Sequence, residues 1–324
     1  MQRITSILFS LAAICILLFT PSLAKAAYPD RPVTIIIPFG PGGAVDIAAR
    51  ILAEYVQTKH GITFNIVCKG GGAGAPALLD VAKAKPDGYT FGFPAIATFS
   101  TTPQVKPTGY TINDFRAVAQ ISVMWLSLAV NADSKIQTVR DLFDAAKGNP
   151  GKTNFATHGA LSTQRLFMAK LIGEKAPDIK LPHVAYISGH EVSTALLGHH
   201  VVSGFGVTTN QKPYVQSGDF RIIGISSPQR LAEFPDSPTF AEQFGPDYVF
   251  PSSHGLIAPQ KTPTDKVVAM QNIIKEALAD PSVKEKFAKA GLTTDYLPAD
   301  EFQEVINKVW QDIGDMLKKY AIVN

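Results

Sequence analysis

Cysteine is scarce in this chain: only Cys15 and Cys68 occur among its 324 residues. Cys15 lies in an apolar N-terminal run that we expect to be removed, so one thiol remains and no internal disulfide can form. A lone cysteine is more often a half-buried packing residue than a nucleophile, and we interpret Cys68 in that way. The fold must therefore be stabilised by packing, and the chain is long enough for a large core in two domains.

An excess of charge of one sign is also lacking. The chain has 30 Lys and Arg against 27 Asp and Glu, and without Arg3 and Lys25 of the N-terminal segment the net charge is about +1. This balance favours neither nucleic acid nor a membrane surface as a partner. Among the histidines, neighbouring His199 and His200 would point in opposite directions in a strand, and no Asp or Cys stands at ligand spacing from them or from His190. We expect no metal and no cofactor.

Only one long apolar run is present, at residues 4–19. It follows Arg3, is ended by Pro21 and precedes residues 24–26, which include small residues where a signal peptidase reads. The run is shorter than the roughly 20 residues that span a membrane. We therefore predict a secretory signal peptide at residues 1–26, removed by cleavage at its end, and a periplasmic location.

Two nucleotide-binding motifs and the hydrolase elbow are absent as well. Residues 40–43 read Gly-Pro-Gly-Gly, but no Lys-Ser or Lys-Thr follows them, as a P-loop requires. Val45 stands where a dinucleotide fingerprint needs its third glycine. A Gly-x-Ser-x-Gly segment, which would present the nucleophile of an α/β hydrolase, does not occur. An exported hydrolase therefore stays only as an alternative.

Residues 33–50 are the most informative stretch that is present. An apolar, β-branched run ends at Pro38, a loop with three glycines and two prolines follows, and apolar residues resume at helical spacing from Ala44. This pattern predicts strand, loop and helix. Such a junction directs unpaired backbone amides and the positive end of the helix dipole at one spot, which suits a phosphate or a carboxylate. Gly42 and Gly43 leave the backbone open to a ligand.

Asp46 lies near the start of the predicted helix and has two interpretations. Either it binds the ammonium group of an amino-acid ligand or orders water at the site, or it is a first-turn acid that the helix dipole stabilises. Its charge would repel a phosphate, and Pro41 removes one amide donor. Nucleotide binding is therefore the less favoured use of this loop.

A second strand–loop–helix unit lies near the middle of the chain. Residues 153–156 read as extended, 157–160 as a loop and 161–172 as a helix. Ser162 and Thr163 supply hydroxyls that cap the helix or donate to a ligand. The unit is therefore a second junction suited to an anion.

Strand and helix patterns alternate through most of the chain, which predicts an α/β fold with mainly parallel sheets. From residue 262 onward the pattern predicts helices only. Further strands are expected at residues 63–67, 89–93, 115–130 (in one or two segments), 183–186, 201–207, 221–226 and 252–258. Further helices are expected at residues 76–84, 139–146, 188–197, 209–217, 263–279, 281–290 and 298–320.

Two such junctions in one exported chain predict two lobes that face each other across a ligand. We expect the chain to leave the first lobe near residue 129 and to return to it near residue 252. The predicted domains are residues 27–129 together with 252–324, and residues 130–251.

Several segments together resemble one protein family. They occur in that family's order, at residues 28–32, 37–46, 85–90, 183–186, 230–241, 255–259 and 279–283. Through them the mature chain resembles the periplasmic substrate-binding receptors of tripartite tricarboxylate transporters, the Bug family. The resemblance implies a periplasmic-binding-protein-like fold of two α/β domains joined by a hinge. It also implies a carboxylate held in the cleft by backbone amides, hydroxyls and water, and membrane transporter subunits as partners.

Two departures from the family pattern concern the ligand. Residues 68–74 lack the arginine that the family often has there, and the second loop contains His158. This histidine either donates to a carboxylate or lies on the surface. The identity of the carboxylate therefore does not follow from the resemblance.

We predict a periplasmic solute-binding receptor that captures a small carboxylate for a tripartite tricarboxylate-type transporter, that is a monomer and that is not an enzyme. A receptor that passes a signal to a membrane sensor is the alternative. Most of the predicted ligand-binding residues follow strand ends, beyond which ligands of parallel α/β sheets bind. They are Phe39, Gly40, Pro41, Gly42, Gly43, Asp46, Ala95, Ile96, Ala97, Thr157, His158, Gly159, Ser162, Thr163, Tyr186, Gly206, Val207 and Thr208.

Overall fold

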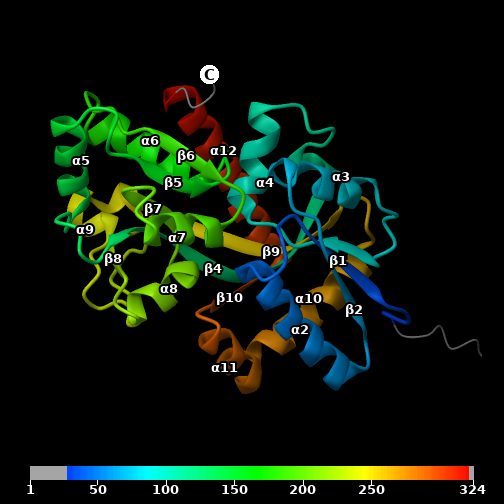
Figure 1. Cartoon of the computed structure of the whole chain (residues 1–324). Helices are drawn as coiled ribbons and strands as arrows, with labels where there is room; N and C mark the ends of the chain where they lie inside the picture. The colour runs from blue at the N-terminus through cyan, green and yellow to red at the C-terminus, as the bar shows by residue number, and fades with distance from the viewer. Residues whose placement is uncertain (1–27, 321–324) are drawn as a thin grey trace, which may run out of the picture. The chain divides into compact units, whose positions relative to one another are not determined.

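The computed structural model describes residues 28–320 of the chain (Figure 1). Two compact units are distinguished, Met1–Asp30 and Arg31–Asn324, and the helices and strands named below belong to the second unit. The predicted signal peptide at residues 1–26 lies outside the described residues. Within residues 28–320, no helix combines the length and the apolar character that crossing a membrane requires.

One group of strands is built mainly from the first part of the chain. Its elements are β1 (Val33–Ile37), α2 (Ala44–His60), β2 (Phe64–Cys68), the 3₁₀ turn η1 (Gly72–Gly74), α3 (Ala75–Lys83), β3 (Thr90–Gly92), α4 (Ile96–Val105), the 3₁₀ turn η2 (Ile112–Asp114) and β9 (Pro251–Pro259). β1 pairs in parallel with β2 and with β3, and β9 joins β3 in antiparallel orientation. The strand–loop–helix unit predicted at residues 33–50 is confirmed as β1, loop and α2.

A second group is built from the middle of the chain. Its elements are α5 (Val139–Gly148), β5 (Phe155–His158), α6 (Thr163–Lys175), β6 (His183–Tyr186), α7 (Gly189–Leu197), β7 (Ser203–Val207), α8 (Thr208–Gln216), β8 (Phe220–Ile225), α9 (Phe240–Phe244) and the 3₁₀ turn η3 (Pro246–Tyr248). β5 pairs in parallel with β6 and β7. The group therefore repeats the plan of the first, and its predicted strand–loop–helix unit is confirmed as β5, loop and α6.

A single long strand, β4 (Phe115–Asn131), is shared by both groups. Its first half pairs with β9 and with β10 (Thr293–Pro298), and its second half pairs with β7 and β8, in every case antiparallel. Figure 1 shows β4 and β9 running between the two groups. The expectation of mainly parallel sheets is therefore wrong, because parallel pairing holds only within each group. Most residues of β4 are buried, since it is covered on both faces.

The C-terminal region contains three helices, which the sequence pattern predicts, and one strand, which it does not. The helices are α10 (Thr264–Ala279), α11 (Pro281–Lys289) and α12 (Ala299–Tyr320). The expectation of helices only is wrong at β10, which pairs Thr293 with Val123 of β4. α4 is also missing from the prediction, and it contains Pro103, a residue that argues against a helix interior.

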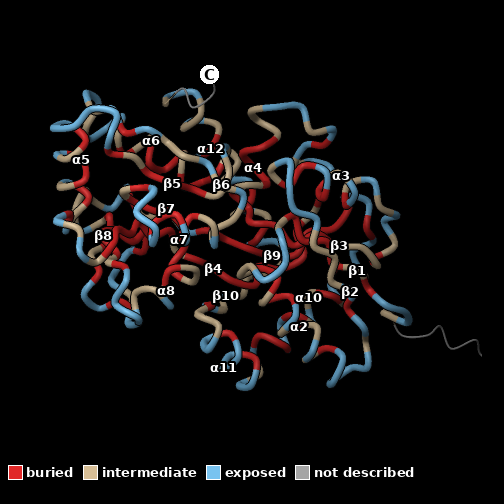
Figure 2. Tube along the Cα trace, in the orientation of Figure 1, coloured by how far each residue is buried: buried red, intermediate tan, exposed pale blue. Residues whose placement is uncertain are grey.

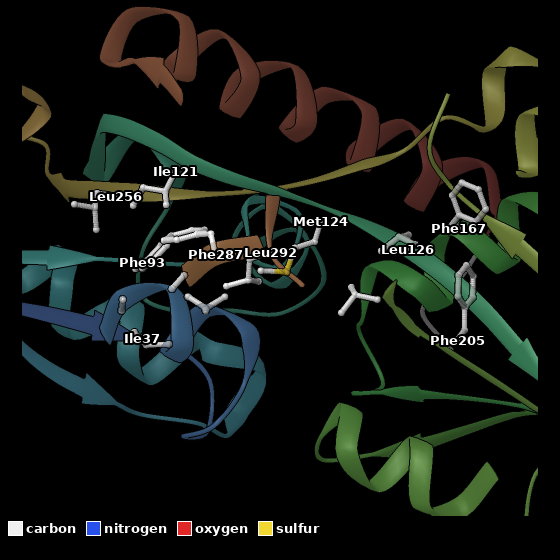
Figure 3. Packing of buried hydrophobic residues seen from close by; sticks show 14 of the residues in the cluster. Ile37, Phe93, Ile121, Met124, Leu126, Phe167, Phe205, Leu256, Phe287 and Leu292 are labelled. Atoms are coloured by element: carbon white, nitrogen blue, oxygen red, sulfur yellow. The ribbon is translucent and has the colours of Figure 1, made fainter. Parts of the chain in front are cut away.

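The buried core is continuous across the two groups. Figure 2 shows that the buried segments follow the strands, whereas the exposed segments lie mainly on the outer helices and loops. In Figure 3, Ile121 of β4 belongs to one cluster with Ile37 and Phe93 from the first group and Phe167 and Phe205 from the second. Because the same core supports the strand ends of both groups, the loops that follow these strands start from well-packed positions.

Candidate functional site

Four helices begin directly after four parallel strands. α2 follows β1, α4 follows β3, α6 follows β5 and α8 follows β7. Because β1 and β3 are parallel neighbours, as are β5 and β7, each pair of helices starts at the same carboxyl-terminal edge of its group. In open α/β sheets, ligands bind beyond that edge. Most of the predicted binding residues occupy these four junctions, at residues 39–43, 95–97, 157–163 and 206–208.

Three of these four helices begin without a side-chain cap. The residues at their starts are Gly43 for α2, Ala95 for α4 and Val207 for α8. By contrast, α5, α7 and α9 begin at a serine or threonine whose hydroxyl accepts a hydrogen bond from an amide of the first turn. α3 and α10 also lack such a cap, so an uncapped start indicates a binding position only where other features agree. The first-turn amides of α2, α4 and α8 need an outside acceptor.

The first loop, residues 39–43, is held by a buried carboxylate. Asp46 is only 3% exposed, and its Oδ2 accepts hydrogen bonds from the Gly42 amide at 2.8 Å and from Arg50 Nε at 3.0 Å. The Cys68 thiol lies 3.3 Å from Asp46 Oδ1. Burial acts to raise the pKa of Asp46, but the hydrogen bonds from Arg50, Gly42 and Cys68 together lower it. The carboxylate is therefore charged at neutral pH and occupied by the protein itself, which favours its interpretation as a support for the loop.

The thiol of Cys68 is not set up as a nucleophile. Burial, followed by the nearby Asp46, raises the pKa of Cys68 to about 11. The thiol is therefore protonated at neutral pH, and only the thiolate is reactive. Within the described residues, no cluster of three or more His, Cys, Asp or Glu side chains is arranged to hold a metal ion.

Open space adjoins the glycines of the first loop. A Cβ atom at Gly40 or at Gly42 would meet no other atom within 4 Å. The other side of the loop is covered, because a Cβ atom at Gly70, in the second glycine-rich segment, would lie 3.1 Å from the Gly40 amide nitrogen. The loop therefore rests on residues 70–74 and presents its backbone on the opposite side.

The second loop, residues 157–163, is held by neutral side chains and by Arg165, whose Nη1 donates to the Ala160 carbonyl oxygen at 2.7 Å. Thr157 Oγ1 lies 2.7 Å from His183 Nε2 and accepts a hydrogen bond from Ser162 Oγ at 2.8 Å. Ser162 also caps α6, since its Oγ accepts a hydrogen bond from the Arg165 amide. Burial, and the positive charge of Arg165, lower the pKa of His183 to about 4. The imidazole is therefore neutral at neutral pH, and Thr157 and Ser162 are used within the loop.

The start of α8 is tied to the start of α6. Gln164 Nε2 lies 3.5 Å from the Gly206 carbonyl oxygen, and Gln211 Nε2 donates to the Gly204 carbonyl oxygen at 2.9 Å. Val207 pairs with Leu126 of β4. The structure thus brings two of the predicted segments, 157–163 and 206–208, to neighbouring positions.

Several predicted positions offer backbone rather than side chains. Ala95, Ile96 and Ala97 are 7%, 0% and 2% exposed, so their side chains belong to the core. Tyr186 packs against the apolar cluster of the second group, and its carbonyl oxygen accepts a hydrogen bond from the Gly159 amide at 2.7 Å. None of the hydrogen bonds of the described residues joins residues 39–43 to residues 157–163, so the facing of these loops across a ligand stays a prediction.

A residue that the sequence interpretation missed, His254 of β9, links the two groups. Its backbone forms an antiparallel bridge with Ala95 at the start of α4, and its side chain is 4% exposed. Burial lowers the pKa of His254 to about 4, a hydrogen bond to the Ser252 backbone opposes this, and the nearby His158 lowers it further. The Nδ1 atoms of His254 and His158 are both buried without a hydrogen-bond partner. The signal that could have found His254 is a single ionisable residue inside an apolar strand pattern.

Comparisons with known proteins agree on one family. Residues 48–322 match a family model described as "Tripartite tricarboxylate transporter family receptor". A UPF0065 protein of Bordetella bronchiseptica is 31% identical over 286 residues, which cover 87% of this chain and 83% of that protein. The solved structure of periplasmic binding protein BugD is 27% identical, with a TM-score of 0.81 and coverage of 91% of this chain and 99% of that one. The structure of R. palustris Rpa4515 with adipate is 24% identical, covers 91% of this chain and 98% of that one, and has the same fold, with a TM-score of 0.83.

Proposed function

This chain belongs to the receptors of the tripartite tricarboxylate transporter family, and we propose that it captures a small carboxylate in the periplasm for the membrane subunits of such a transporter. It is a solute-binding receptor and not an enzyme, so the hydrolase alternative is not favoured. The predicted signal peptide at residues 1–26 supports the periplasmic location.

One observation carries the choice of an anionic ligand: three helices begin uncapped beyond the ends of parallel strands in both groups. The residues are Gly43, Ala95 and Val207. Residues 38–46 and 156–163 contain no Lys or Arg, so backbone amides would bind the ligand instead of a charged clamp. Such amides, with hydroxyls and bridging water, satisfy a carboxylate well.

The size of the ligand is proposed from a protein of the same fold. Rpa4515 was solved with adipate, a linear dicarboxylate. Uncapped helix starts occur in both strand groups. They suit a molecule with two carboxylate groups, one for the helix starts of each strand group. We therefore propose a dicarboxylate as the first class to test and add His254 to the proposed ligand-binding residues.

The proposed domains are residues 27–129 with 252–324, and residues 130–251. Strand pairing supports this division, because β5 and its two parallel partners, β6 and β7, all fall within the second range. β4 and β9 connect the groups near both boundaries. We propose that the groups close on the ligand by bending at these strands.

The test is a thermal-shift screen of the mature chain against monocarboxylates, dicarboxylates, tricarboxylates and the matching diamides. A ligand that binds only the folded protein raises its melting temperature. We expect a dicarboxylate to raise it and the uncharged diamide to leave it unchanged. A screen in which no carboxylate has an effect would contradict the proposal.

The decisive variant is Gly43→Leu. Gly43 has φ −76° and ψ 167°, which any residue adopts, and its Cβ atom would lie 3.6 Å from the Gly40 carbonyl oxygen, an ordinary contact. The variant should fold normally, and calorimetry should show affinity for the acid reduced by more than about tenfold. Gly148→Leu is the matched control, because a Cβ atom there meets open space at the end of α5. Unchanged affinity in Gly43→Leu would remove the first loop from the site.

A further inference from the structure

A pocket of about 530 Å³ lies between α12 and the strands β4, β9 and β10. None of the residues that line it belongs to the four strand–helix junctions described above. Its apolar wall includes Val123, Trp125, Phe250 and Val309. The volume falls within the range of small-molecule sites, which is roughly 300–1,000 Å³.

The pocket lies beside α12 at one position of its buried face. The buried residues of the helix are Phe302, Ile306 and Ile313, which follow the spacing of one helical face. Val309 occupies the remaining position of that face, yet it is only half-buried and lines the pocket. Figure 3 shows α12 crossing above β4, on the side away from Ile121 and Leu126. Val309 therefore packs partly against the core and partly faces the pocket.

Gln120, one of the residues that line this pocket, contains an unsatisfied acceptor. Gln120 is 2% exposed, and its Nε2 donates a hydrogen bond to Asp295 Oδ2 at 3.0 Å. Because a carboxylate accepts only from the NH₂ group, this bond fixes the orientation of the amide. Gln120 Oε1 is consequently left buried without a donor. An unsatisfied buried oxygen of this kind is destabilising unless a donor reaches it.

The charges around the pocket favour a cation. Lys308 and Asp312, which line it, already pair with each other at 2.8 Å. Among the described residues, Asp295 has no cationic partner within 4 Å, and burial raises its pKa. The lining therefore contains one carboxylate, exposed to solvent, that has no side-chain partner of opposite charge among residues 28–320.

We propose that this pocket binds a small organic cation that has an N–H donor group and an apolar body. The ammonium or amidinium group donates to Gln120 Oε1 and Asp295, and the apolar body packs against Trp125, Phe250 and Val309. The indole ring of Trp125 adds an attractive face for a cation. The pocket is distinct from the proposed carboxylate site, and the two sites can be occupied together.

The probes are phenethylamine and benzamidine, titrated into the full mature chain by calorimetry near neutral pH, with phenethyl alcohol as the uncharged control. We expect both cations to bind and the alcohol to bind more than about tenfold more weakly. Absence of binding by both cations up to about 10 mM, or equal binding of the alcohol, would overturn the proposal.

Two variants locate the binding. Val309→Trp fills the pocket and Asp295→Asn removes its unpaired charge, and each should weaken phenethylamine by at least about tenfold. Asp315→Asn, an exposed acid on the same helix, is the control and should leave affinity unchanged. Melting curves verify that the variants are folded. If Val309→Trp does not fold, the affinity of Asp295→Asn for phenethylamine alone tests whether binding occurs in this pocket. Wild-type affinity in Asp295→Asn would overturn the assignment whether or not the carboxylate proposal holds.

Discussion

The loop before α2 and the loop before α6 have the same place in their strand groups but are held by different chemistry. In the first, the charged Asp46 accepts from Gly42, Arg50 and Cys68. In the second, the carboxylate is replaced by neutral Thr157, which bonds both Ser162 and His183, and Arg165 donates to the Ala160 carbonyl oxygen. The difference teaches that a strand–loop–helix pattern specifies where the backbone turns but not which side chains hold it there. It also implies that the two loops respond differently to substitution and to pH.

Replacing Asp46 with Ala should give the largest loss of stability. The change leaves the Gly42 amide and the Cys68 thiol without their acceptor and removes a charged hydrogen bond to Arg50. The free energy of unfolding should fall by about 2–3 kcal/mol, measured by urea denaturation. Asp46→Asn is the control that keeps the shape and one acceptor oxygen, and it should cost less. A loss below about 0.5 kcal/mol in Asp46→Ala would show that the carboxylate does not hold the loop.

Replacing Thr157 with Val should have a smaller effect, because only neutral bonds are lost. Val keeps the shape of Thr but removes the hydroxyl that His183 Nε2 and Ser162 Oγ contact. We expect a loss of about 1–2 kcal/mol in the same measurement. Thr194→Val, on the exposed side of α7, should change stability by less than about 0.5 kcal/mol. Equal effects of the two substitutions would show that the Thr157 network adds nothing.

The third prediction separates the loops by pH. His183 has a pKa of about 4 in the folded chain and an ordinary value of 6.5, so the unfolded chain binds its proton first as the pH falls. Its contribution is complete above pH 6.5 and is lost between pH 6.5 and about 4. Asp46 has a lowered pKa, so its contribution is present above its ordinary value of 3.8 and is lost only as the pH falls below that value.

His183→Gln tests this difference, since Gln cannot titrate in that window. The slope of unfolding free energy against pH between about 6.5 and 4 should decrease by up to about 1.4 kcal/mol per pH unit. Part of the slope should remain, because His254 is also held near a pKa of 4. Asp46→Asn should alter the dependence only at lower pH. An unchanged slope in His183→Gln would contradict the assignment of His183 as a neutral support.

Local patterns predicted the strand–helix units well, because each depends on neighbours in the sequence. The apolar run before Pro38 and the helical spacing after Ala44 are sufficient for β1 and α2. β10 could not be found in this way, because among the described residues its strand partner is β4, where Thr293 pairs with Val123. The antiparallel role of β4 was hidden for the same reason, since a buried strand reads as an apolar run whatever its direction.

The residues of the candidate site also fall into two sets: those that the sequence predicted and those that only the structure revealed. The glycines of residues 39–43 and the junctions at 157–163 were predicted from turn chemistry and strand ends. His254 was not, because its importance comes from a bridge to Ala95 and from its proximity to His158. The role of Asp46 was left between two interpretations, and its contacts with Gly42 and Cys68 favour support of the loop.

The sequence alone therefore determined the family and the order of the strand–loop–helix units, since these depend on periodicity, glycine and strand ends over a few residues. Tertiary structure decided that β4 serves both strand groups, that β10 completes the sheet, that His254 lies beside Ala95, and that a pocket remains under α12. The physical reason is that strand pairing and packing join residues that lie far apart in the chain, where no local periodicity records the contact.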